Sequence, residues 1–97
     1  MFTLRGRDLI YGTASTRLGW HAPRVLAHLA VHPDASLLDL ARAIRPQVRT
    51  VTPEAVRTQV CRLRAAARQL GAPLDIRPTY YKGYRLHTPV TVVSGND

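Results

Sequence analysis

Arginine side chains mark two neighbouring segments in the second half of this chain, residues 52–70 and residues 74–87. The first segment carries Arg57, Arg62 and Arg68, with threonine, cysteine and alanine among the residues between them. A guanidinium group is always charged, and its planar fork of donors matches carboxylates, phosphates and the edges of guanine bases. Because small neighbours let an anion approach the backbone, this segment has the chemistry of a surface that binds a polyanion.

A helical wheel separates apolar from basic residues over positions 54–70. The apolar side contains Val56, Val60, Leu63, Ala67 and Leu70. The opposite side contains Arg57, Thr58, Cys61, Arg62, Ala65, Arg68 and Gln69, with Arg64 at the flank. No acidic residue stands between positions 55 and 74, whereas a merely solvated helix face usually interleaves acids with bases. The uncompensated repulsion favours a polyanionic partner.

The second basic segment, residues 74–87, predicts a β-hairpin directly after this helix. Its strands, LDIRP and YRLH, are joined by a turn around residues 81–83. Basic and aromatic side chains stand in or near the turn, namely Arg77, Tyr80, Lys82 and Arg85. A helix that enters a groove, beside a ribbon that touches the adjacent backbone, indicates duplex DNA as the partner.

The overall charge agrees with a polyanionic partner. Fourteen Lys and Arg against six Asp and Glu give a net charge of +8, with a pI near 11.1. An anionic membrane is disfavoured, because no apolar run approaches the roughly 20 residues that span a bilayer. The amino terminus lacks the apolar core of a secretory signal, and the single Cys61 allows no internal disulfide. We therefore expect a cytoplasmic, nucleoid-associated protein that does not bind membranes.

The preceding elements must position the helix and the hairpin. Short strands are predicted over residues 2–18 from FTLRG and DLIYG, and TRLG is a candidate third strand. Helical spacing begins at Pro23 and stops at Pro33, after which Ser36 is suited to cap a second helix. Trp20 and Tyr11 are expected to serve the core.

The second helix has a predicted apolar stripe and ends at or before Arg45. The stripe contains Leu37, Leu40, Ala41 and Ile44. Thr52 is the predicted N-cap of the third helix, with Pro53 in its first turn, and Gly71 ends that helix. Near the carboxyl end, VTVV is a candidate for one more strand.

Two motifs together resemble the OmpR/PhoB-type winged-helix DNA-binding domain, the effector half of many bacterial response regulators. Residues 56–64, VRTQVCRLR, follow a family pattern like V-x-V-x-I-x-R-L-R, and residues 76–86, IRPTYYKGYRL, follow one like I-x-T-V-R-G-x-G-Y-R-L. The resemblance implies an α+β winged helix-turn-helix with short antiparallel amino-terminal strands, three helices and a carboxy-terminal hairpin wing. The domain would span residues 1–88, with 89–97 as a tail, in a protein of bacterial or phage origin.

The resemblance also implies roles for single residues. Arg62 matches a position that contacts bases in the major groove, and Thr58 matches a neighbouring groove-facing position. Arg57 and Arg64 would contact phosphates or form salt bridges. In the wing, Tyr84 would pack inward and Arg85 would face the DNA backbone or a carboxylate. The expected DNA-binding residues are Arg57, Thr58, Cys61, Arg62, Arg64, Arg68, Arg77, Tyr80, Lys82 and Arg85.

The sequence departs from the family pattern at the wing tip. Tyr80 replaces an arginine that often enters the minor groove, and Tyr81 replaces a glycine, while Arg77 and Lys82 offer replacement charge. The family's receiver domain is absent, which predicts a stand-alone protein. Residues 45–51 lie where the family often touches RNA polymerase. A homodimer on DNA is left open.

Other candidate sites are weaker. His28 and His32 form an i,i+4 pair that is able to hold a metal, with His21 nearby in sequence, but only Asp34 stands close to them. Solvated residues bordering the apolar stripe are the favoured interpretation. Cys61 is either a reactive thiol beside two arginines or, as we favour, a small residue that fits against DNA.

No enzyme is expected from this sequence, because no nucleophile with a base, paired catalytic carboxylates or phosphate loop stands out. We therefore expect no cofactor and no metal. The predicted function is sequence-specific duplex DNA binding in transcription regulation, with helix 54–70 in the major groove and wing 74–87 on the flanking backbone or minor groove. The alternative is a protein-interaction module whose basic face docks on an acidic partner, such as RNA polymerase or another regulator. The wing tip with Tyr80 and Tyr81 suits either partner, a DNA groove or a protein pocket.

Overall fold

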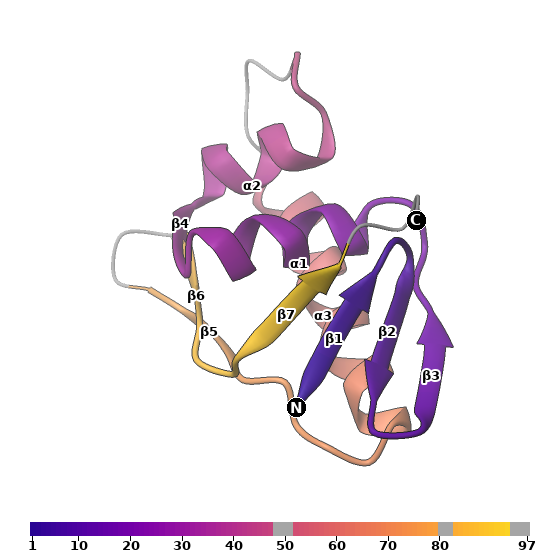
Figure 1. Cartoon of the computed structure of the whole chain (residues 1–97). Helices are drawn as coiled ribbons and strands as arrows, with labels where there is room; N and C mark the ends of the chain where they lie inside the picture. Colours follow the sequence, from indigo (N-terminus) through magenta and orange to yellow (C-terminus); the bar gives the residue numbers. More distant parts are fainter. Residues whose placement is uncertain (48–51, 80–82, 94–97) are drawn as a thin grey trace.

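The computed structural model describes residues 1–47, 52–79 and 83–93 (Figure 1). In this part of the chain, three short strands precede two helices, and the long third helix is followed by a hairpin and a last strand. The elements in order are β1 (Phe2–Arg5), β2 (Asp8–Tyr11), β3 (Ala14–Arg17), α1 (Ala22–Val31), β4 (Asp34–Ser36), α2 (Leu37–Ile44), α3 (Pro53–Gln69), β5 (Ile76–Pro78), β6 (Gly83–Leu86) and β7 (Val90–Val93).

A four-stranded sheet with the order β3-β2-β1-β7 forms one side of the molecule. Strands β1, β2 and β3 are antiparallel, as predicted, and β7 joins β1 in parallel, so that Leu4 lies opposite both Leu9 and Val92. The VTVV segment, which the sequence left open, thus forms strand β7. The third strand begins earlier than TRLG, at Ala14. The division of the chain at residue 88 stays a prediction.

The helices begin and end close to the predicted residues. Helix α1 starts one residue before Pro23, which lies in its first turn. The Oγ of Ser36 accepts a hydrogen bond from the backbone N–H of Asp39 at 3.1 Å, which confirms the predicted cap of α2. After α3, Gly71 adopts a φ of 89°, a conformation that favours glycine.

The N-terminus of α3 differs from the prediction in one detail. Thr52 occupies the N-cap position in extended backbone, but its side chain makes no capping hydrogen bond. This helix start is exposed, and Pro53 has no N–H to satisfy, so water can serve the remaining donors.

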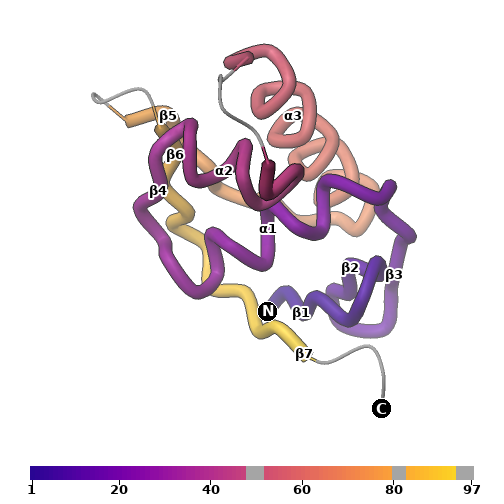
Figure 2. Tube along the Cα trace, turned by 90° about the horizontal axis from the view of Figure 1, so that it is seen from above, coloured from indigo at the N-terminus to yellow at the C-terminus, as the bar shows by residue number. Residues whose placement is uncertain are grey.

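Helix α1 lies at the centre of the core, between the four-stranded sheet and helix α3 (Figure 2). Its Val25, Leu26 and Leu29 are completely buried. Burial of one such side chain stabilises the fold by roughly 1.5–3 kcal/mol. Other core side chains come from the sheet and from α2 and α3, and they include Phe2, Leu4, Leu9, Leu40, Val56, Val60, Leu63 and Ala67. The sequence predicted this stripe of α3, whereas Leu37 and Ile44 of α2 are only partly buried.

A second sheet, with the order β4-β6-β5, holds the hairpin against the rest of the molecule. Strand β4 was not predicted, because three residues between two helices carry no periodic signal. Gly83 makes the pairing of β4 with β6 feasible. A Cβ atom at this position would overlap the carbonyl oxygen of Ala35 and lie 3.0 Å from its carbon.

The two aromatic residues assigned to the core from the sequence behave differently. The ring of Tyr11 packs on Phe2 with a centroid distance of 4.9 Å, as expected. The expectation for Trp20 is wrong, because this side chain is 70% exposed. Leu18, two residues earlier, fills the buried position, and the Arg7 guanidinium covers the Trp20 ring, with Cζ 3.7 Å from its centroid.

No helix in the described ranges is long and apolar enough to cross a bilayer.

Candidate nucleic-acid interface

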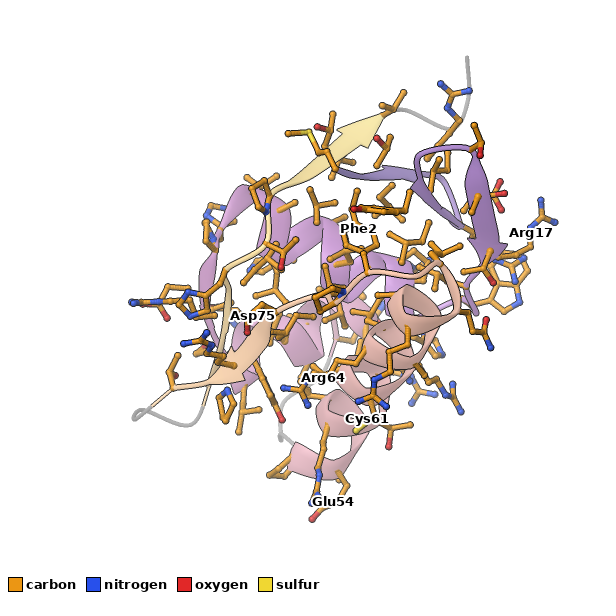
Figure 3. All side chains as sticks on the ribbon, turned by 90° about the horizontal axis from the view of Figure 1, so that it is seen from below. Phe2, Arg17, Glu54, Cys61, Arg64 and Asp75 are labelled. Atoms are coloured by element: carbon orange, nitrogen blue, oxygen red, sulfur yellow. The ribbon has the colours of Figure 1, made fainter. Side chains whose placement is uncertain are left out.

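The exposed side of α3 carries the residues that the helical wheel placed there. Arg57, Thr58, Cys61, Arg62 and Arg68 are all exposed. Figure 3 shows α3, with Cys61 and Glu54 labelled, on the side of the molecule opposite the four-stranded sheet. The buried side is wider than predicted, because it also includes Gln59 and Ala66.

Among the described residues, the arginines on this face have no acidic partners. Within residues 1–47, 52–79 and 83–93, the salt bridges join Arg17 to Asp8, Arg77 to Asp75, and Arg85 to Asp34. None involves α3, whose only acidic residue is Glu54 in the first turn. The charges of Arg57, Arg62 and Arg68 are therefore available to an anion outside the molecule.

Thr58 is oriented by the helix itself. Its hydroxyl donates a hydrogen bond to the backbone carbonyl of Glu54 at 2.8 Å. The donor of this side chain is therefore occupied, while the lone pairs of its oxygen and its methyl group remain exposed. Such a side chain can accept a hydrogen bond from a base amino group or contact a thymine methyl group.

Arg64 connects α3 to the hairpin. Its side chain is half-buried, and its Nη2 donates a hydrogen bond to the backbone carbonyl of Ile76 in β5. The sequence suggested a phosphate contact or a salt bridge for Arg64. The hydrogen bond to a carbonyl is neither of these. It could not be predicted from the sequence, because only the fold brings β5 next to α3.

The outer face of the hairpin carries arginines of a different kind. Arg77 and Arg85 lie opposite each other across β5 and β6, and Arg85 lies opposite Asp34 across β6 and β4. Arg85 Nη2 is 2.5 Å from Asp34 Oδ2. The Nε and Nη2 atoms of Arg77 donate to the two carboxylate oxygens of Asp75 at 2.9 and 2.8 Å. Of the two alternatives expected for Arg85, the contact with a carboxylate is present, and Tyr84 packs against the core as expected.

The Arg77–Asp75 pair shifts the protonation of both groups. Hydrogen bonds from the Arg77 guanidinium lower the pKa of the Asp75 carboxyl, and the attraction between the two charges adds to this effect. The same hydrogen bonds raise the pKa of Arg77. The pair is exposed, so its contribution to stability is small.

The first turn of α3 adjoins the end of the hairpin that is next to its turn. A hollow of about 170 Å³ is lined by Glu54 and Arg57 of α3 and by Pro78, Gly83 and Tyr84 of the hairpin. One continuous surface thus runs from the basic side of the helix to the hairpin.

Several predicted site residues lie outside the described residues. These are Tyr80 and Lys82 of the wing tip, Tyr81 beside them, and residues 48–51 of the loop assigned to RNA polymerase contact. Their roles stay predictions. The rings of His28 and His32 lie 5.0 Å apart, and within the described ranges no cluster of three or more potential metal ligands occurs.

The arrangement as a whole defines a winged helix-turn-helix fold of the α+β class, as predicted: helices α1 and α2, a long third helix with one exposed face, and a hairpin on its flank. The solved structure of the DNA-binding domain of E. coli CadC shares this fold with a TM-score of 0.71. The match covers 87% of this chain and 81% of that chain, with 19% sequence identity. No family model and no curated protein sequence matches this chain.

Proposed function

We propose that this protein binds duplex DNA with sequence preference and acts in transcription regulation. One observation carries the proposal: the exposed face of α3 presents Arg57, Arg62 and Arg68 without an acidic partner in the described residues. The similarity in fold to a solved DNA-binding domain supports it.

In the proposed complex, α3 lies in the major groove. An α-helix with its side chains is roughly 10–12 Å across and the groove is roughly 12 Å wide, so α3 fits lengthwise into it. Arg62 reads a guanine edge with its two-pronged donor group. Thr58 reads an amino or methyl group, because its own donor is engaged with Glu54. Arg57 and Arg68, toward the two ends of the helix, bind phosphates.

The hairpin follows the flanking backbone in this proposal. Arg64 holds β5 against α3 and so sets the distance between the two contact regions. Arg77 and Arg85 are held by carboxylates and contribute less charge than their number indicates. Tyr80 and Lys82 complete the proposed wing-tip contact.

The proposal is tested by titrating a random-sequence duplex at low and at moderate salt. A protein that neutralises several phosphates loses orders of magnitude in affinity as salt rises. Arg68→Ala should lower the slope of log K against log salt by about one, with the same loss on every sequence. Arg5→Ala removes the same charge from an exposed site on the sheet and serves as the matched control.

Absence of duplex binding at either salt concentration would refute the proposal. It would favour the alternative in which the basic face docks on an acidic protein.

A further inference from the structure

A second surface, distant from the exposed face of α3, combines an apolar groove with basic side chains. The groove has a volume of about 310 Å³ and lies where the ends of β1 and β7 approach the first half of α1. Its floor includes Leu4 of β1 and Ala27 of α1, and its walls include Trp20 and Val92. Figures 2 and 3 both show the sheet and α3 on opposite sides of the molecule.

The apolar side chains of this groove are unusually exposed. Trp20 is 70% exposed and Val92 is 45% exposed. Val92 lies opposite Leu4 in the β1–β7 register and therefore faces the core side of the sheet, yet it remains uncovered because β7 is the edge strand. Tryptophan, together with tyrosine and arginine, is enriched at the energetic centres of protein interfaces.

The rim of the groove is basic. Arg7 stacks on the Trp20 ring and is held there by a hydrogen bond from its Nε to the carbonyl of Leu18 at 3.3 Å. Arg24 is held by a hydrogen bond from its Nη1 to the carbonyl of Ile44 at 3.2 Å. Both arginines are fixed by neutral carbonyls and keep their charge, and among the described residues no acidic side chain lines the groove.

We propose that this groove docks an acidic segment of a partner protein. A bulky apolar side chain of the segment enters between Trp20 and Val92, and flanking carboxylates pair with Arg7 and Arg24. The fixed guanidinium groups favour carboxylates, since a planar fork matches them with two hydrogen bonds. Because the groove lies away from α3, the partner and DNA bind at the same time. The proposal does not depend on DNA binding.

Trp20 supplies a direct readout, since it is the only tryptophan in the chain. The probe is a short synthetic peptide with a central Phe-Leu pair flanked by aspartate and glutamate. Saturable binding should shift the Trp20 emission to shorter wavelength as the ring leaves water. A peptide with serine in place of Phe-Leu, and one with lysine in place of the acids, should each bind at least roughly tenfold more weakly. No emission shift with the acidic Phe-Leu peptide would overturn the proposal.

Variants assign the binding to this surface. Val92→Ser and Arg7→Gln keep the tryptophan and should each weaken binding, while Trp20→Ala, followed with a labelled peptide, should weaken it by roughly tenfold or more. Trp20 and Val92 are exposed and Arg7 is half-buried, and circular dichroism checks that each variant keeps the fold. Retention of binding in Trp20→Ala and Val92→Ser, together with its loss in Arg62→Ala, would place the peptide on α3 and overturn the proposal. Displacement of the peptide by duplex DNA would do the same.

Discussion

The exposed face of α3 and the outer face of the hairpin are both rich in arginine, yet the two surfaces differ in what surrounds the charge. On α3, Arg57, Arg62 and Arg68 have no acidic partner in the described residues. On the hairpin, Arg77 and Arg85 are each joined to an aspartate. The same residue type is therefore free to bind an external anion on one surface and already occupied on the other.

This difference matters for affinity. A phosphate that binds Arg85 must replace the Asp34 carboxylate or share the guanidinium with it. A phosphate or base that meets Arg62 replaces only water. The number of arginines on the hairpin therefore overstates what the hairpin can contribute to anion binding. In the proposed complex, the paired arginines order the wing sheet and the unpaired ones recognise the DNA.

The largest effect is expected from disrupting the wing sheet itself. Gly83→Ala places a methyl group against the backbone of Ala35, so β6 and β4 must separate. We expect the free energy of unfolding to fall by about 1–3 kcal/mol, measured by denaturant unfolding. Gly19→Ala is the control, since a Cβ there meets nothing within 4 Å. Equal stability of the two variants would contradict the close packing of β6 on β4.

The comparison between free and paired arginines is tested by Arg62→Ala and Arg85→Ala. Loss of Arg62 should weaken binding to a selected duplex by about 1–3 kcal/mol and relax base preference at one position. Loss of Arg85 should cost less than about 1 kcal/mol with no change in preference. Both are measured by fluorescence anisotropy against a panel of single-base variants of the duplex. A larger cost for Arg85→Ala would reverse the assignment of the two surfaces.

The connection between the two surfaces is tested by Arg64→Met. Methionine keeps an apolar stem but removes the donor to the Ile76 carbonyl, so this half-buried carbonyl loses its partner. We expect a loss of about 1 kcal/mol in unfolding free energy. We also expect faster amide exchange in β5. Arg68→Met, at an exposed site on the same helix, should change neither quantity.

The smallest effect concerns pH. Because Arg77 lowers the pKa of Asp75 in the folded protein, this pair contributes stability above the carboxyl's ordinary pKa of about 3.9 and loses it as pH falls through the lowered value. An NMR titration of the Asp75 carboxyl should show the lowered pKa in the native protein. In Arg77→Ala the pKa should rise, since the hydrogen bonds that lower it are lost. An unchanged titration curve would show that the two side chains do not pair in solution.

The sequence predicted most of the helical framework, because its signals are local. Proline in the first helical turns, Ser36 as a cap and Gly71 after α3 act within a few residues of their own positions. The apolar stripe of α3 follows from the helical period alone. What could not be predicted depends on distant residues: β4 becomes a strand only because Gly83 lets β6 approach it, and Trp20 is exposed because Leu18 occupies the buried position.

The sequence by itself determined which face of α3 is polar and basic, because helix geometry assigns each residue to a side. It also placed a hairpin after that helix. Only the tertiary structure decided that Arg85 and Arg64 are engaged, because their partners are distant in sequence: Asp34 lies 51 residues before Arg85, and Ile76 lies 12 residues after Arg64. It likewise decided that Trp20, Arg7 and Val92 line one groove, since that requires the parallel pairing of β7 with β1.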